Sequence, residues 1–222
     1  MATQINTIET VSETQKQASM THLLKWIPHI LLSIASVLLL VSISLPYWGM
    51  ILEAPQYPGG LEIHLFVNQM AGNEETKLDE VREIDNLNHY IGMASLFEAA
   101  ELERQIAVPG IIVMAVALVI VAFIQRRWVW LLAIPALTFP FVFLGDLAFW
   151  LNYYGQNLDP YAPLSSSIKP FTPMVLGEST IGQFKTIAYV DSGWSLSVVA
   201  AGLVLTGLLF RLLLVTRLAR SK

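Results

Sequence analysis

Long apolar runs alternate with polar stretches along the chain, and four of these runs are long enough to cross a bilayer. A helix needs about 20 apolar residues to span the hydrocarbon core of a membrane. Because lipid offers the backbone no hydrogen-bond partners, each run must satisfy its own polar groups as a helix. We therefore predict four membrane-spanning helices, over residues 26–48, 108–125, 128–150 and 194–215.

The polar stretches complete the predicted organisation. Residues 1–25 are expected to form a disordered cytoplasmic tail, because Thr, Gln, Ser and Glu are frequent in them. A turn at 126–127 and a tail over 216–222 are also expected in the cytoplasm. The longer stretches, 49–107 and 151–193, are expected to pack together outside it. The predicted fold class is all-α transmembrane: a four-helix membrane bundle with a small mixed α+β extracytoplasmic cap built from two loops.

Local patterns predict few regular elements within this cap. Alternate positions from Leu61 to Val67 are apolar, which is typical of a strand with one buried face. Good helix formers predict a helix over 95–106 that leads into the second span. The second cap segment has four prolines between residues 160 and 173, so we expect little regular structure there.

The composition is typical of a membrane protein, and the distribution of charge predicts its orientation in the membrane. Hydrophobic residues make up 55% of the 222 positions and charged residues 14%, with a mean hydropathy of +0.57. Soluble domains carry more charge than this. Basic residues gather at 126–127 and near the C-terminus, so the positive-inside rule places both termini in the cytoplasm. Residues 49–107 contain eleven acidic and three basic residues, a formal charge of −8.

Further function classes are excluded by what the sequence does not contain. It has no cysteine, which excludes disulfides, zinc–thiolate sites, iron–sulfur clusters and thiol catalysis. It has no basic patch of the kind that binds nucleic acid, so nucleic acid is not an expected partner. The expected partners are the lipid bilayer and other membrane or extracytoplasmic protein subunits.

Several stretches of the sequence resemble a family of small, uncharacterised bacterial membrane proteins with four spans. The first cap segment contains "APQYPGGL" and "EIDNLNHYIGM", and the second contains "YGQNLDPYAP" followed by "FTP". Members of that family are often found near nitrous-oxide-reductase maturation and copper-handling components. The resemblance implies a location in the bacterial inner (cytoplasmic) membrane and a context of copper handling.

The stretch "EIDNLNHYIGM", residues 83–93, is the main candidate site. On a continuous helix Asp85, His89 and Met93 lie four residues apart and share one face. Imidazole with thioether suits Cu(I), and imidazole with carboxylate suits Cu(II) or Zn(II). His64, on the polar side of the predicted strand, could supply a second imidazole. The sequence therefore predicts a metal site, with copper as the candidate cofactor.

A structural interpretation of the same stretch stays open. Asp85, Asn86 and Asn88 are residue types that cap helices and form turns. Tyr90 suits a membrane interface, and Met93 suits an apolar core. Under this interpretation residues 83–93 are a capped turn between a strand and a helix.

Two charged residues near the ends of predicted spans need separate explanations. Asp146 is a functional candidate, because a carboxylate at membrane depth is costly. The alternative for Asp146 is a structural pairing with Asn152, Lys169 or Lys185. Arg211, near the end of the fourth span, is expected to extend to the cytoplasmic interface.

These observations support two functional hypotheses. The first is an integral membrane accessory protein that binds or hands over copper during assembly of a copper enzyme. The second is a non-catalytic accessory or structural subunit of a larger respiratory or other membrane complex. The small size and the lack of a nucleophile–base set favour a non-enzymatic role over an enzyme or transporter.

Overall fold

The computed structural model of the protein describes residues 24–73 and 78–220. Within this part, four helices are long and apolar enough to cross a membrane: Leu24–Ser42, Glu101–Phe123, Arg127–Gln156 and Ser192–Leu214. These helices agree in length and composition with the four predicted spans, although several of their ends differ. The disorder predicted for residues 1–25 falls almost wholly outside the described residues.

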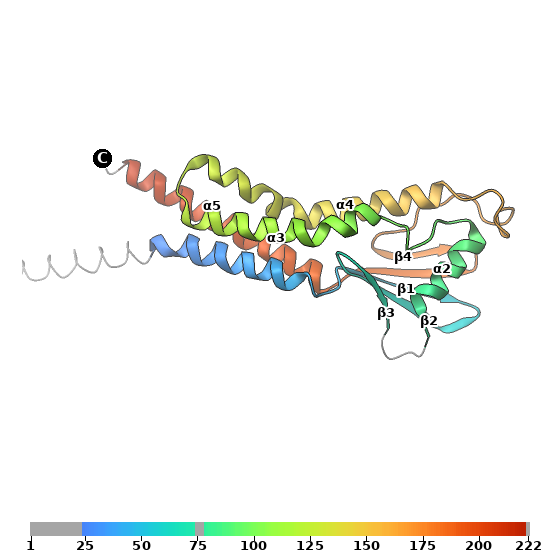
Figure 1. The fold of residues 1–222 in the computed structure, drawn as a ribbon. Helices are drawn as coiled ribbons and strands as arrows, with labels where there is room; N and C mark the ends of the chain where they lie inside the picture. The colour runs from blue at the N-terminus through green and yellow to red at the C-terminus, as the bar shows by residue number, and fades with distance from the viewer. Residues whose placement is uncertain (1–23, 74–77, 221–222) are drawn as a thin grey trace, which may run out of the picture.

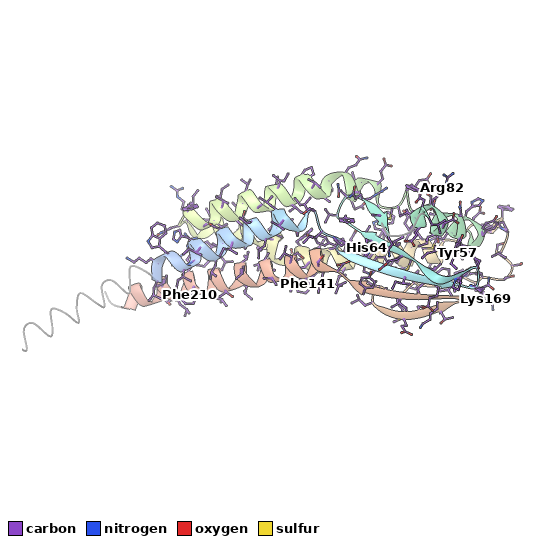
Figure 2. The ribbon with its side chains drawn as sticks, turned by 90° about the horizontal axis from the view of Figure 1, so that it is seen from below. Tyr57, His64, Arg82, Phe141, Lys169 and Phe210 are labelled. Atoms are coloured by element: carbon purple, nitrogen blue, oxygen red, sulfur yellow. The ribbon has the colours of Figure 1, made fainter. Side chains whose placement is uncertain are left out.

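The molecule is elongated, with the four long helices at one end and a β-sheet at the other (Figure 1). Helix α3 (Glu101–Phe123) is followed by a 3-10 segment, η1 (Arg127–Ala133), which continues into α4 (Ile134–Gln156). Helix α5 covers Ser192–Arg220. In Figure 2, Phe141 and Phe210 lie on the helices, whereas Tyr57, Arg82 and Lys169 lie at the sheet end.

Two distant parts of the chain build the sheet. The first contributes β1 (Trp48–Ala54), β2 (Tyr57–Leu65) and β3 (Met70–Gly72). The second contributes β4 (Gly177–Ile181) and β5 (Phe184–Val190). The strand order is β3-β2-β1-β5-β4, and every neighbouring pair is antiparallel. The central β1–β5 pair therefore joins the two segments into one unit, called the sheet domain below (residues 46–100 and 157–191).

The predicted all-α class is wrong, because the described residues contain a five-stranded antiparallel sheet as well as the helices. The prediction recognised one strand in the first segment and none in the second. The missed hairpin of β4 and β5 turns at Gly182, which has a φ of 62°. A glycine with positive φ in a two-residue connection is a strong hairpin signal. The prolines that precede this hairpin obscured the signal.

One face of the sheet is buried and the other is partly exposed. Leu61 and Ile63 of β2 are 1% and 3% exposed, and they pack with Val81 and Ile84 of helix α2 (Glu80–Ile91). The strand predicted over Leu61–Val67 with its odd positions inward is thus confirmed from Leu61 to Leu65, where β2 ends. His64 alternates with these residues and lies on the opposite, outer face, near the junction with the helices (Figure 2).

Helix α3 begins later than predicted. The helix expected over 95–106 starts at Glu101, after Ala100 adopts a left-handed φ of 49°. The preceding residues form turns instead. Pro109 lies inside the continuous helix.

Arg211 has a structural role that differs from the prediction. Its side chain is 7% exposed rather than extended to an interface. The guanidinium donates hydrogen bonds to the carbonyls of Val121 and Ile124, at the C-terminal end of α3. The last carbonyls of a helix lack partners within the helix, so Arg211 satisfies two of them.

Candidate ligand-binding cavity and neighbouring polar residues

The stretch from Glu83 to Met93 forms most of α2 and its C-terminal end. Asp79 begins the helix by accepting a hydrogen bond from the backbone N–H of Arg82, at 3.1 Å. Gly92 ends it in the left-handed conformation, with a φ of 82°. The N–H of Met93 then donates to the carbonyl of Asn88 at 2.9 Å, as in a Schellman motif. Because the helix ends here, Met93 does not continue the helical face of Asp85 and His89.

The predicted metal ligands are distributed over separate environments. The carboxylate of Asp85 accepts hydrogen bonds from the Ser95 hydroxyl at 2.9 Å and the Leu96 N–H at 2.6 Å. His89 is exposed, whereas Met93 packs in an apolar cluster with Ala54, Ile91 and Phe184. The described residues contain no group of three His, Cys, Asp or Glu side chains placed to hold a metal ion.

The other polar candidates of this stretch also have defined places. Asn88 is 9% exposed, whereas Tyr90 is 52% exposed. Asn86 is exposed to solvent. Residues 83–91 are helical, so the prediction of a capped turn between a strand and a helix is wrong, although Asp85 does have a structural role in holding Ser95 and Leu96. Copper binding stays a prediction, which metal analysis of the purified protein would test.

The sequence stretches that carry the resemblance meet in space around α2. The Tyr57 hydroxyl, from the first stretch, donates to the Glu83 carboxylate at 2.5 Å. The N–H of Asp159, from the third stretch, donates to the carbonyl of Gly92 at 2.8 Å. The N–H of Leu164 donates to the carbonyl of Tyr90 at 3.0 Å. Residues 83–93 are therefore the centre to which the two segments of the sheet domain attach.

A cavity of about 420 Å³ lies between the inner face of the sheet and the helices. Its wall includes Met50 and Ile63 from the sheet, Leu87 from α2, Ala107 from α3 and Leu151 from α4. Most of the lining side chains are apolar. The wall also includes residues that face the outside of the helices, since Ile106 and Val142 are 56% and 60% exposed. The cavity thus reaches the apolar side surface of the protein between α3 and α4.

The polar and charged side chains on this mostly apolar wall include Asn88, Glu103, Arg104 and Asp146. Arg104 uses its Nη2 to donate a hydrogen bond to the carbonyl of Phe97, which holds the turn before α3. Asp146 lies within electrostatic range of Glu103. The sequence predicted Asp146 as a functional candidate, but it did not predict the cavity that Asp146 lines.

The structural pairings proposed for Asp146 are wrong. The Asn152 side chain instead accepts a hydrogen bond from Thr172 at 2.8 Å. Lys185 forms an ion pair with Glu178, at 3.1 Å between Nζ and Oε2. Neither Asp146 nor Lys169 forms an ion pair in the described part of the chain. Asp146 therefore contributes a carboxylate to the cavity wall without a basic partner there.

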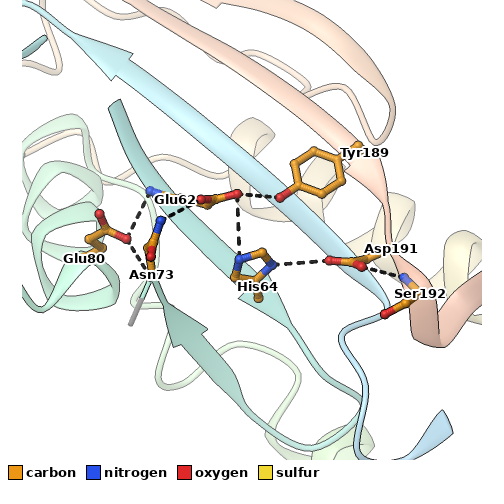
Figure 3. Close-up of polar contacts among 7 residues, drawn as sticks. All are labelled: Glu62, His64, Asn73, Glu80, Tyr189, Asp191 and Ser192. Carbon is orange, nitrogen blue, oxygen red and sulfur yellow. Dashed lines mark hydrogen bonds and ion pairs between the residues drawn. The ribbon is translucent and has the colours of Figure 1, made fainter. Parts of the chain in front are cut away.

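A second polar group lies on the outer face of the sheet (Figure 3). His64 Nδ1 lies 3.3 Å from Asp191 Oδ2, and His64 Nε2 lies 3.7 Å from Glu62 Oε1. The Tyr189 hydroxyl donates to the same Glu62 oxygen at 2.7 Å. Its ring crosses Gly49, where a Cβ atom would lie 2.5 Å from the ring. Burial and the Glu62 carboxylate raise the pKa of Tyr189, so its hydroxyl stays protonated and donates.

This outer group connects the sheet to the membrane helices. Asp191 follows β5 directly and precedes α5, and its Oδ1 accepts a hydrogen bond from the Ser192 N–H at 2.5 Å. Glu80 of α2 satisfies backbone donors of the sheet. Its Oε2 accepts hydrogen bonds from the N–H of Asn73 at 2.7 Å and from the N–H of Glu62 at 3.3 Å. These hydrogen bonds and ion pairs give the polar residues of the outer face a structural role.

No protein-family model matches the chain, and no curated protein is detectably similar to it in sequence.

Proposed function

We propose that the protein is an integral membrane protein whose sheet domain binds an apolar molecule taken from the lipid bilayer. The observation that carries this proposal is the cavity between the sheet, α2, α3 and α4. Its volume of about 420 Å³ lies within the usual range of ligand sites, roughly 300–1,000 Å³. An apolar wall with a few polar groups is also typical of such sites, where the polar groups orient the ligand.

The position of the cavity favours a ligand that arrives from lipid. Phe139 and Phe143 of α4 line it from within the third apolar helix, and Ala107 lines it from within the second. Ile106 and Val142, which also line it, are exposed on the apolar surface. A hydrophobic molecule in the bilayer could therefore reach the cavity between α3 and α4 without crossing water.

Binding should be sensitive to the volume of the cavity. We expect Ala107→Phe to weaken binding of the neutral fluorescent probe N-phenyl-1-naphthylamine at least tenfold, equivalent to about 1.4 kcal/mol. The added ring would occupy space that the ligand needs. Fluorescence titration of the purified protein in lipid nanodiscs, with empty nanodiscs as background, measures this affinity.

The matched control carries the same new residue on the same helix. Val113 is 67% exposed on α3, so Val113→Phe should leave the affinity unchanged. Mass spectrometry of lipids retained by the wild-type protein gives an independent reading. Equal binding by both variants and the wild type would contradict the proposed function.

The proposal also includes an orientation, with the sheet domain outside the cytoplasm of a bacterial inner membrane. Arg126 and Arg127 lie at the helix ends farthest from the sheet, whereas residues 49–107 carry a formal charge of −8. The positive-inside rule favours a cytoplasmic location for the basic turn. Four spans then place the C-terminus in the cytoplasm as well.

Reporter fusions test this orientation. Fusions at residue 75 and near residue 166 should be active outside the cytoplasm, and fusions after Arg127 and at the C-terminus inside it. A single inverted reading at Arg127 would refute the proposed orientation.

A further inference from the structure

The cavity wall carries more negative than positive formal charge. Among the described residues, those that line the cavity include three with a formal charge: Glu103 and Arg104 on α3, and Asp146 on α4. Two carboxylates from different helices, Glu103 and Asp146, therefore line the same mostly apolar cavity.

The one positive charge on this wall is engaged only in part. The Arg104 guanidinium donates through Nη2 to the carbonyl of Phe97, which stabilises the turn before α3, whereas its Nε is buried without a hydrogen-bond partner among the described residues. By contrast, no ion pair involves Glu103 or Asp146 anywhere in residues 24–73 and 78–220. Two like charges in a setting of low polarity repel each other more strongly than in water. A positive group between them would replace this repulsion with two attractions.

We propose that the cavity selects an amphiphile with a cationic, hydrogen-bond-donating head group, of which a long-chain primary amine is the simplest representative. This inference rests on the proposed function, since it names the ligand class of the same cavity. The ammonium lies between Glu103 and Asp146, and the chain occupies the apolar space beneath the sheet. Long-chain carboxylates and phosphates are rejected, because the wall and the −8 charge of residues 49–107 both repel anions.

A competition experiment with one chain length and three head groups tests the selection. Dodecylamine, dodecanol and dodecanoate are each titrated against bound N-phenyl-1-naphthylamine, using protein in nanodiscs of zwitterionic lipid. We expect dodecylamine to displace the probe at a concentration at least about tenfold below that of dodecanoate, with dodecanol between them.

The carboxylates are then removed without a large change in shape. In the double variant Glu103→Gln, Asp146→Asn, the preference for amine over carboxylate should fall to within about threefold. The control is Glu98→Gln, Glu101→Gln, which removes the same charge from exposed positions outside the cavity lining and should keep the preference. Partition of each compound into lipid is the same for all proteins, so differences between variants report the site.

The outcomes separate this inference from the proposed function. If all three compounds displace the probe equally, or dodecanoate displaces it best, the head-group selection is wrong while the cavity still binds apolar molecules. If the double variant keeps the wild-type preference, Glu103 and Asp146 are not its cause and the inference fails. If the probe shows no binding that Ala107→Phe weakens, the proposed function itself fails.

Discussion

Replacing Gly92 with alanine is expected to destabilise the sheet domain by about 2–4 kcal/mol. Gly92 has a φ of 82°, which costs an L-residue with a Cβ atom about 1–2 kcal/mol. The new Cβ would also lie 2.7 Å from the carbonyl oxygen of Asp159 and 2.9 Å from Ala162 Cβ. Because one of these contacts is with backbone, the 157–164 connection would have to move. Chemical unfolding in detergent, followed by near-UV circular dichroism, measures the loss.

Gly59 provides the matched control for this substitution. It does not have a positive φ, and a Cβ built on it meets nothing within 4 Å. Gly59→Ala should therefore change the free energy of unfolding by less than about 0.5 kcal/mol. Equal effects at the two positions would mean that the 157–164 connection does not pack on the end of α2.

Ile63→Asp should destabilise the sheet domain by several kcal/mol, because it places an unpaired carboxylate in an apolar core. Ile63 is 3% exposed and packs with Val81 and Ile84. Ile187→Asp on the outer face should cost much less, since that side chain is only partly buried. Thermal unfolding of the two purified variants compares them. A similar drop in Tm for both would show that the outer face is covered in the native protein.

The membrane helices and one strand could be predicted because their signals are local. An apolar run of about 20 residues identifies a span whatever the rest of the chain does. Alternation from Leu61 to Leu65 likewise reports one buried face within a single strand. Both signals depend on neighbouring residues alone. The strand is present in β2, and the described helices are long and apolar enough to be the predicted spans.

The sheet as a whole could not be predicted, because its central pairing joins distant residues. Trp48 pairs with Val190, and Glu53 pairs with Lys185. In the sequence, "WGMILEA" follows the first span without a polar break and reads as its continuation. Only the pairing with β2 and β5 makes this segment a central strand.

The candidate site shows the same limit. The spacing of Asp85, His89 and Met93 predicts a shared face only if the helix continues, and Gly92 ends it. Glu103 escaped notice because a carboxylate among other acids near a helix start resembles a solvated surface group. Its relation to Asp146, which lies on another helix and lines the same cavity, cannot be seen in the sequence. That the protein acts as an accessory subunit of a larger complex stays a prediction.

The pairing of β1 with β5 also fixes when the protein can finish folding during synthesis. β1 (Trp48–Ala54) follows the first apolar helix and β5 (Phe184–Val190) immediately precedes the last, so the ribosome must make the residues up to β5 before the two strands can meet. Until then β1 keeps an unpaired edge, which is a target for pairing with other chains. Synthesis of the segment between α4 and α5 is therefore the step that closes the sheet, and a chain that stalls before it leaves that edge exposed.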